Sequence, residues 1–365
     1  MKYTNALAIL LFILMLPSHS YTQNYHLDSL AILSQAVPES SGLLFKEGRL
    51  ITHNDSGGAP HLYEIDTLDG QVVREVVINN AQNIDWEDLT ADSTYLYIGD
   101  IGNNFGNRTD LTIYKIPWSE YLTRDSIEAQ QINYSYSDQL DFSNNQFFTP
   151  YDAEALVAIG DSLFLFTKDW STAHSKVYPL PKTPGTYAAI AIDSFAVPGL
   201  ITGVDLSPGG NQLLLSAYSG TSAFVLAFSD FTAFPLSVET VYSWPLPLTG
   251  SIKSEGICWR NDRFAYISTE QVGTLPSVLY RLDTDFVSAV TFPESSLVKV
   301  FPQPATENIQ VTAKQIYGLE LYNANGTLVL KTTQAYLDVS HLPAGMYFLM
   351  ILMEGQELVK QVIVI

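Results

Sequence analysis

The sequence contains a single cysteine, Cys258, among its 365 residues, so no disulfide can form within the chain. Positive charge is also scarce, because Lys and Arg number 18 against 38 Asp and Glu, which gives a formal net charge of -20. Such an acidic chain disfavours anionic partners, and we expect no binding to nucleic acid. Beyond the first residues, no apolar run is long enough to span a membrane, so we expect no membrane span.

The first 20 residues have the pattern of a secretory signal peptide. Lys2 supplies a positive charge, residues 6–16 form an apolar run too short to cross a bilayer, and Ser18 to Ser20 resemble a small-residue cleavage site. We therefore predict a signal peptide over residues 1–20 and a mature chain that enters the periplasm.

Composition favours β-structure over helices. Hydrophobic residues make up 47% of the chain, Tyr and Phe number 21 and 18, and charged residues only 15%. An apolar run with a preceding acid or serine recurs with starts at residues 41, 87, 154, 205 and 255. This spacing, roughly 40–50 residues apart from one longer gap, is typical of four-stranded propeller blades. The longer gap holds residues 121–151, which we interpret as an inserted loop.

Three strands can be traced in every repeat, and a fourth in the first four, where the fourth repeat's is 237–244 and the third repeat's is 187–195. The fifth repeat lacks its fourth strand, while residues 29–35 form a strand that precedes the first repeat. The strand over residues 29–35 can serve as the fourth strand of the fifth repeat, which would close a ring of sheets without open edges. The sequence thus predicts an all-β fold with a five-bladed β-propeller over residues 21–290; six blades remain possible if the long gap hides one.

A linker over residues 291–297 and a separate module of short strands over residues 298–365 follow. In this tail, residues 301–305 (FPQPA), 319–326 (LELYNANG), 339–348 (VSHLPAGMYF) and 360–365 (KQVIVI) resemble the type A C-terminal sorting domain of the type IX secretion system of Bacteroidetes. The resemblance implies a small β-sandwich, recognition by the type IX machinery, export across the outer membrane, and release or attachment at the cell surface.

Acidic residues cluster where the first strand of each repeat begins and the second ends. These ends share one face of a propeller, so the side chains should crowd one channel mouth. Oxygen ligands without cysteine favour calcium, with magnesium as an alternative, over zinc. The predicted metal ligands are Glu39, Asp55, Asp85, Glu87, Asp100, Asp152, Glu154, Asp169, Asp205, Glu255 and Glu270.

Each candidate has a competing structural interpretation. Acids at strand ends often accept hydrogen bonds from turn amides. Lys168 could hold an anionic substrate or pair with a neighbouring acid, and His53 could be a general base or a turn histidine. Glu87 and Glu154 complete the set of candidate catalytic residues.

The body also resembles, more loosely, secreted propellers related to the esterase-like phytase group. The residues that carry this resemblance are 85–89 (DWEDL), 97–104 (YIGDIGNN), 152–156 (DAEAL), 167–170 (TKDW) and 254–257 (SEGI). The resemblance implies calcium binding and action on phosphoesters or esters. The predicted mouth departs from that pattern because it has little Lys or Arg to hold phosphate.

Two functions therefore remain open at this point. One is a monomeric exported module whose acidic, calcium-binding mouth holds a small molecule, a glycan or a protein. The other is a calcium-dependent hydrolase of phosphoesters, esters or lactones with a Glu or Asp general base.

Overall fold

The computed structural model describes residues 25–169, 172, 174–197, 199–219, 222–236, 241–248, 253–284, 298–312, 316–323, 328–353 and 356–365. The predicted signal peptide, the predicted linker, Trp170 and residues 324–326 of the tail segment 319–326 lie outside these residues.

The body is all-β apart from one short helix, α1 (Trp118–Tyr121), and its described residues form five sheets of four or five strands. The first sheet consists of β2 (Ser40–Lys46), β3 (Arg49–Asn54), β4 (His61–Ile65), β5 (Val72–Ile78) and β9 (Ser126–Ile127). The second contains β6 (Trp86–Ala91), β7 (Tyr95–Asp100), β8 (Thr112–Pro117), β10 (Gln130–Tyr136) and β14 (Gly185–Ala189).

The other three sheets have four strands each. The third consists of β11 (Ala153–Ile159), β12 (Ser162–Thr167), β13 (His174–Pro181) and β15 (Asp193–Ala196). The fourth consists of β16 (Leu200–Leu206), β17 (Gln212–Ser219), β18 (Ser222–Ser229) and β19 (Val241–Pro245). The fifth consists of β20 (Ser254–Trp259), β21 (Phe264–Thr269), β22 (Val278–Asp283) and β1 (His26–Ile32).

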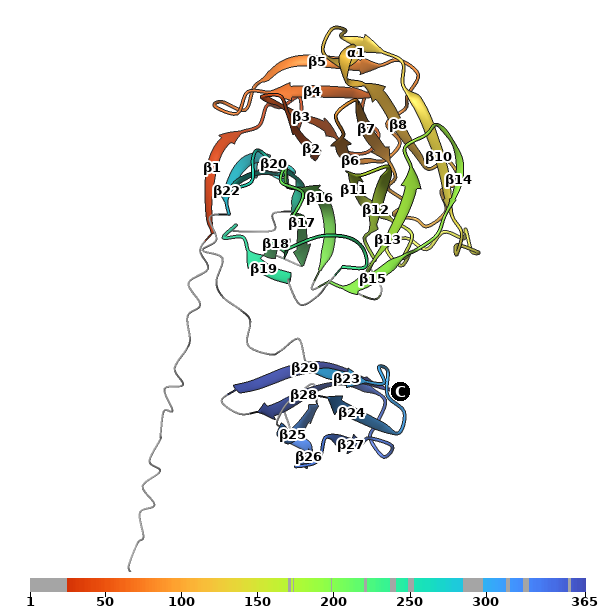
Figure 1. Cartoon of the computed structure of the whole chain (residues 1–365), viewed down its shortest axis with the longest axis vertical. Helices are drawn as coiled ribbons and strands as arrows, with labels where there is room; N and C mark the ends of the chain where they lie inside the picture. Colours follow the sequence, from red (N-terminus) through yellow and green to blue (C-terminus); the bar gives the residue numbers. More distant parts are fainter. Residues whose placement is uncertain are drawn as a thin grey trace, which may run out of the picture.

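The first strand of each sheet lies at the centre of the body. β2 packs against β6, β6 against β11, β11 against β16, β16 against β20, and β20 against β2. Figure 1 shows these five strands in the middle of the body, with β5, β14, β15, β19 and β1 at its periphery. The inner strands are buried along most of their length, whereas the outer strand β14 alternates between half-buried and exposed residues before its last residue, Ala189, which is buried. The arrangement is propeller-like.

The N-terminal strand joins the last sheet, as its unpaired sequence pattern predicted. β1 runs antiparallel to β22, with His26 opposite Asp283 and Ile32 opposite Val278. A side-chain contact reinforces the pairing, because Arg281 Nη2 donates to Asp28 Oδ2 at 2.6 Å. The pairing covers an edge of the fifth sheet that would otherwise offer unpaired backbone groups.

Two expectations about strands were wrong. Residues 187–195 do not form one strand, because β14 pairs parallel with β10 of the second sheet and β15 pairs with β13 of the third. The chain changes sheets between them, where Ile190 is exposed. The fourth repeat begins at Leu200, not at Asp205, because the apolar residues that precede Asp205 are already part of β16.

The described residues of the tail form two sheets around a core of their own. The smaller sheet consists of β23 (Lys299–Phe301), β24 (Asn308–Thr312) and β27 (Tyr336–Asp338). The larger consists of β26 (Leu328–Thr332), β25 (Ile316–Asn323), β28 (Gly345–Met353) and β29 (Gln356–Val364). Leu319, Leu349 and Ile351 are fully buried between the sheets, so the tail has the two-layer architecture expected of a small β-sandwich.

Gly256 lies where the inner strand β20 of the fifth sheet packs against the inner strand β2 of the first sheet. A Cβ at this position would lie 2.2 Å from the backbone oxygen of Ser41. We expect Gly256→Ala to lower the free energy of unfolding by about 1–3 kcal/mol, the usual cost of overpacking, in urea denaturation. Gly58→Ala is the matched control, because its Cβ would make only ordinary contacts at 3.6 Å or more; equal loss in both variants would contradict the tight packing of β20 on β2.

Candidate functional site

A β-bulge interrupts the pairing near the start of all five inner strands. The bulges lie between Ser40 and Leu43, Trp86 and Asp88, Ala153 and Ala155, Ile201 and Gly203, and Ser254 and Ile257. A bulge leaves an extra residue outside the ladder and re-aims its side chain. Three bulges contain a glutamate, namely Glu87, Glu154 and Glu255, and the other two contain Ser41 and Thr202.

The two hydroxyl side chains at these bulges tie neighbouring strands together. Ser41 Oγ donates to the backbone oxygen of Glu87 at 2.8 Å, and Thr202 Oγ1 donates to that of Ser254 at 2.7 Å. Each hydrogen bond therefore fixes the backbone at or beside a glutamate bulge on the next sheet but adds no charge. The ionisable side chains at the bulges, Glu87, Glu154 and Glu255, therefore belong to the second, third and fifth sheets.

Asp55, Asp85 and Glu87 form the tightest group of carboxylates. One oxygen from each lies within 4.8 Å of the others. Asp55 follows β3 and Asp85 precedes β6, so the group joins the first two sheets. Asn83 holds this junction, because its Nδ2 donates to the backbone oxygens of Asn54 and Asp55 at 2.9 and 2.6 Å.

Gly102 leaves the space between two of these carboxylates open. A Cβ at Gly102 would lie 2.1 Å from Glu87 Oε1 and 2.4 Å from Asp85 Oδ2. Only glycine therefore allows both oxygens to approach the same point of the backbone. Oxygens on opposite sides of a calcium ion, each about 2.3–2.6 Å from it, are about 4.6–5.2 Å apart, so the oxygen-only group Asp55, Asp85 and Glu87 fits a calcium ion.

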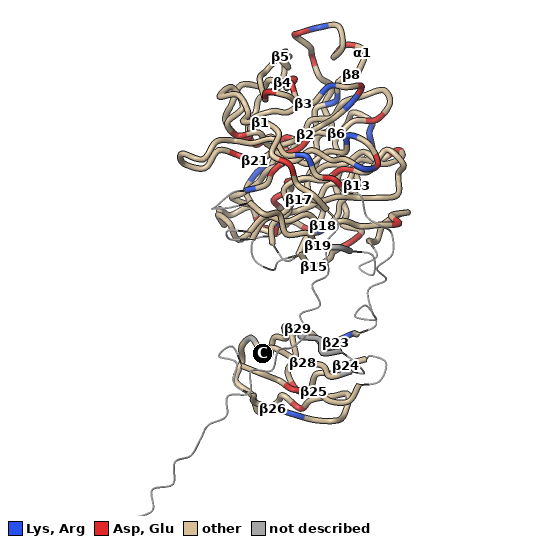
Figure 2. The backbone as a smooth tube through the Cα atoms, turned by 90° about the vertical axis from the view of Figure 1, so that its left-hand side faces the viewer, with Lys and Arg blue, Asp and Glu red and all other residues tan. Residues whose placement is uncertain are grey.

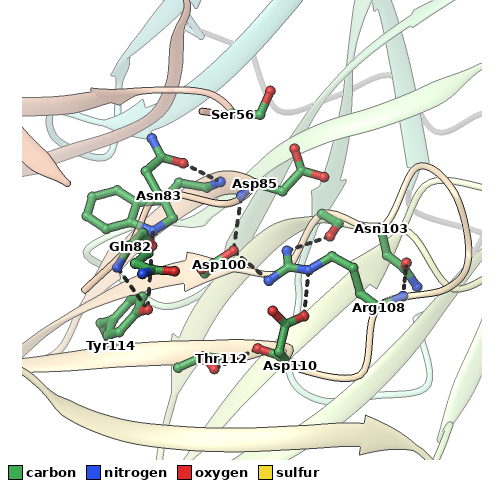
Figure 3. Close-up of polar contacts among 12 residues, drawn as sticks. Ser56, Gln82, Asn83, Asp85, Asp100, Asn103, Arg108, Asp110, Thr112 and Tyr114 are labelled. Carbon is green, nitrogen blue, oxygen red and sulfur yellow. Dashed lines mark hydrogen bonds and ion pairs between the residues drawn. The ribbon is translucent and has the colours of Figure 1, made fainter. Parts of the chain in front are cut away.

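Asp100 and Arg108 lie next to the backbone of Asp85 and position it (Figure 3). Asp100 Oδ1 accepts from the backbone N–H of Asp85 at 3.1 Å and pairs with Arg108 Nη2 at 2.9 Å. Arg108 also donates to Asp110 Oδ1 at 3.0 Å and to the backbone oxygen of Gly102 at 2.8 Å. In Figure 3 the Asp85 carboxylate points away from Arg108. Asp100, a predicted metal ligand, thus has a positioning contact with Asp85.

Lys168 and Glu154 form a buried ion pair beside this group. Their Nζ and Oε1 atoms lie 2.9 Å apart, and both side chains are buried. Burial alone would lower the pKa of Lys168. Glu154, Tyr218 and Glu255 raise it by more than burial lowers it, so the pKa lies well above its usual value. The ammonium also lies 5.5 Å from the centre of the Tyr218 ring. Lys168 is therefore charged, and it offsets part of the negative charge.

Burial and mutual repulsion raise the pKa of the mouth carboxyls. Burial is the main cause in each case, and it brings Asp55 to about 6, Asp85 to about 7 and Glu255 to about 8. Asp55 and Asp152 raise the pKa of Asp85 further, and Glu154 raises that of Glu87. Without a cation, some of these groups hold protons near neutral pH.

Four other predicted ligands lie around this centre. Asp152 Oδ1 accepts from the backbone N–H of Asn103 at 2.6 Å, and Asp169 Oδ1 accepts from that of Thr172 at 3.1 Å. Glu270 pairs with Lys253, and Glu39 is exposed. Hydrogen bonds to turn amides and ion pairs, the competing interpretation for such acids, therefore engage three of the four. Figure 2 shows acidic positions among the inner strands as well as on outer turns.

Asp205 and His53 are not placed as expected. Asp205 is the sixth of seven residues in β16, and its Oδ2 accepts from the backbone N–H of Trp259 at 2.8 Å. It is thus far along the strand from the bulge end, because β16 begins five residues earlier. His53 is fully buried with its ring edge against Trp86, and burial lowers its pKa to about 4. A buried, neutral ring packed in this way is a core residue.

Three residues of the site were not among the predicted site residues. Tyr218, the penultimate residue of β17, lies beside Lys168, Gly102 leaves open the space between two carboxylates, and Asn83 joins two sheets. In the segment 97–104 the sequence pattern points to the acid and the amides, although Gly102 determines how closely Asp85 and Glu87 approach the backbone. Tyr218 carries no distinguishing signal in a chain with 21 tyrosines.

Comparison with known proteins identifies the tail. Residues 299–365 match the family described as the secretion system C-terminal sorting domain. The tail is a type IX sorting domain, so the chain is an exported, β-rich protein destined for secretion or the cell surface. No curated protein matches the sequence. Among the described residues, no helix has the length and apolar character needed to cross a membrane.

Solved structures resemble the chain only distantly. A protein described as exported, from Bacteroides fragilis, is 10% identical with a TM-score of 0.38, over 71% of this chain and 94% of that one. The extracellular domain of a hybrid two-component system from B. thetaiotaomicron is 12% identical with a TM-score of 0.34, over 88% and 50%. The β-propeller domain of Cps50 (Swd1) from Myceliophteria thermophila is 10% identical with a TM-score of 0.34, over 90% of this chain and 96% of that one. At these TM-scores the likenesses support no argument about function.

The raised pKa values predict how stability depends on pH in the absence of metal. These carboxyls bind protons more tightly in the folded state than in the unfolded chain. The stability that this difference contributes is fully present near pH 4 and is lost as the pH rises through about 6 to 8. In a metal chelator, the melting temperature should fall by several degrees between pH 5 and pH 8.

Asp85→Asn should flatten that fall, because it removes one of the repelling carboxylates. Glu128→Gln, at an exposed position away from the mouth, should leave the profile unchanged. Thermal unfolding followed by circular dichroism measures both. A melting temperature that rises from pH 5 to pH 8 in the unaltered protein would contradict the assignment.

Proposed function

We propose that this exported protein is a five-bladed β-propeller whose acidic mouth binds a divalent cation, calcium before magnesium, and serves as a ligand-binding module. The cation is held by Asp55, Asp85 and Glu87. The observation that carries the proposal is the convergence of three carboxylate oxygens within 4.8 Å, beside a glycine that leaves the space between two of them open.

The blade count is supported by the strand pairings. Five sheets each contribute one strand to a central ring of contacts, and β1 completes the fifth sheet. The long gap between the second and third repeats supplies strands β9 and β10 to the first and second sheets, so residues 104–151 form no sheet of their own. Five blades account for every described strand of the body.

The chemistry of the donors supports calcium. The three side chains are carboxylates, which hard cations prefer, and the described residues of the mouth offer no cysteine or exposed histidine. Burial makes a bare cluster of negative charges unfavourable, and a divalent cation would offset that repulsion more effectively than protons can at pH 7 and above. Lys168 already plays this part for Glu154.

One observation favours the second candidate, a metal-dependent hydrolase. Glu154 lies next to the proposed cation site, and burial raises its pKa well above the ordinary range, as is common for groups that transfer protons. Its ion pair with Lys168 argues the other way, because Lys168 stabilises the charged carboxylate. We therefore place the binding module first.

Calcium titration of the purified protein tests the proposal. We expect saturable binding that raises the melting temperature at pH 8, since a ligand at about 100 times its Kd contributes about 2.7 kcal/mol. Glu87→Gln and Gly102→Ala should each weaken binding at least about tenfold, the first by removing a donor and the second by filling the space between donors.

Glu128→Gln is the control and should bind calcium as the unaltered protein does. Isothermal titration calorimetry measures the affinities, with magnesium as a comparison. Equal affinity in the Glu87→Gln variant would place the cation elsewhere. Calcium-dependent turnover of chromogenic phosphate, ester or lactone substrates that disappears in Glu154→Gln would replace the module by the hydrolase.

A further inference from the structure

Five large apolar side chains stand exposed on two neighbouring loops. We call them the apolar ridge; they are Phe105 (43% exposed), Leu140 (92%), Phe142 (41%), Phe147 (43%) and Phe148 (74%). Elsewhere in the body, Phe166, Phe224 and Phe228 are buried in the core. An exposed group of this kind on a soluble protein marks an interaction surface more often than an accident of folding.

Hydrogen bonds join the two loops into one structure. The backbone N–H of Asn145 donates to the oxygen of Phe105 at 2.9 Å, and that of Phe147 donates to the oxygen of Asn104 at 3.0 Å. Gln139 Nε2 donates to the backbone oxygen of Gly106 at 2.8 Å. The ridge is thus held in place by its backbone, although its side chains are exposed.

The backbone at Phe147 is also unusual. Its φ is 60°, in the left-handed region that bulky residues rarely adopt. Such conformations persist where the surroundings enforce them, and they concentrate at functional sites. The conformation supports a ridge that is built rather than incidental.

The ridge adjoins the acidic mouth. Asn104, which precedes Phe105, approaches Asp85 Oδ2 with its Nδ2 at 3.5 Å, and Asn103 donates to Asp152. The segment 137–151 links β10, which lies next to the edge strand β14 of the second sheet, to the inner strand β11. A ligand bound at the Phe105 end of the ridge would therefore lie close to Asp85.

We propose that the ridge and the mouth together bind a polypeptide segment in which apolar side chains stand next to lysine or arginine. When ionised, the carboxylates of Asp55, Asp85, Glu87, Glu154 and Glu255 outnumber the Lys168 ammonium, so an excess of negative charge remains even with one divalent cation bound. A cationic partner is complementary to that charge. The inference deepens the proposed function and rests on it, since it names the ligand class of the same mouth.

The ridge itself favours a polypeptide over a neutral sugar. Leu140, its most exposed member, is aliphatic and offers no flat face for stacking on a sugar ring. Apolar side chains of a peptide can bury both leucine and phenylalanine, and the basic residues can use the adjacent charge. A neutral oligosaccharide would leave that charge unused.

A synthetic peptide of alternating leucine and lysine, labelled with a fluorophore, is the probe. In fluorescence anisotropy with the full protein and calcium, it should bind saturably and more weakly at high salt. Peptides that replace leucine by serine, or lysine by glutamate, should bind at least about tenfold more weakly. Phe148→Ser and Leu140→Ser should each weaken binding of the leucine–lysine peptide about fivefold to tenfold.

Leu68→Ser is the matched control, because Leu68 is an equally exposed leucine (86%) in the turn between β4 and β5. It should leave peptide binding unchanged. Circular dichroism checks that the surface variants fold. Undiminished peptide binding in both ridge variants, or no peptide binding at all, overturns the proposal. Ridge-dependent binding of a neutral soluble glucan in place of the peptide overturns it as well.

Calcium titration without peptide separates this inference from the proposed function. Calcium binding with no peptide binding sinks the inference and leaves the cation site standing. Ridge-dependent peptide binding without any calcium binding would support the ligand class and sink the cation site. The ridge variants should bind calcium normally, since no ridge residue is one of the three proposed donors.

Discussion

Repulsion among buried carboxylates is the constraint on which the mouth of this protein depends. Asp55, Asp85 and Glu87 are held close together by the backbone, and because Glu87 is buried and the other two are half-buried, water screens their repulsion only in part. Three means of relief are open to such a group: protonation, an internal cation, or a bound ion. The raised pKa values reflect the first and Lys168 supplies the second. The proposed calcium ion is the third, and it would add to the charge that Lys168 supplies beside Glu154.

The ring of inner strands creates this constraint by bringing together residues that are far apart in the chain. Glu87, Glu154 and Glu255 occupy the same position in their sheets, at a bulge near the start of the strand. In a regular ladder, one residue more or less would turn each side chain to the opposite face. The repeated bulge is thus what aims the glutamates, and the hydroxyls of Ser41 and Thr202 hold the backbone beside two of them.

Much of this arrangement could be predicted from the sequence, because acids that precede apolar runs recur at regular intervals. The pairing of β1 with β22 also followed from two incomplete patterns. The fourth repeat misled because its bulge carries Thr202, and Asp205, the nearest acid, lies far along the same strand. The strand over 187–195 was misjudged because alternation does not reveal which sheet a strand joins. Tyr218 and Gly102 act through proximity, which is a property of the ring and not of any local motif.

The same geometry explains why binding and stability should be linked in this protein. A group of carboxylates that is unfavourable when bare lowers the stability of the folded chain at and above neutral pH. Any cation that binds the folded state alone restores that stability by mass action. Asp100 accepts a hydrogen bond from the backbone N–H of Asp85 and is itself paired with Arg108, and neither contact needs the cation. The fold therefore pre-organises the carboxylates before any ion binds, and an added cation would supply only charge. The affinity of the cation should then depend on the number of carboxylates that it contacts and not on the formation of new structure.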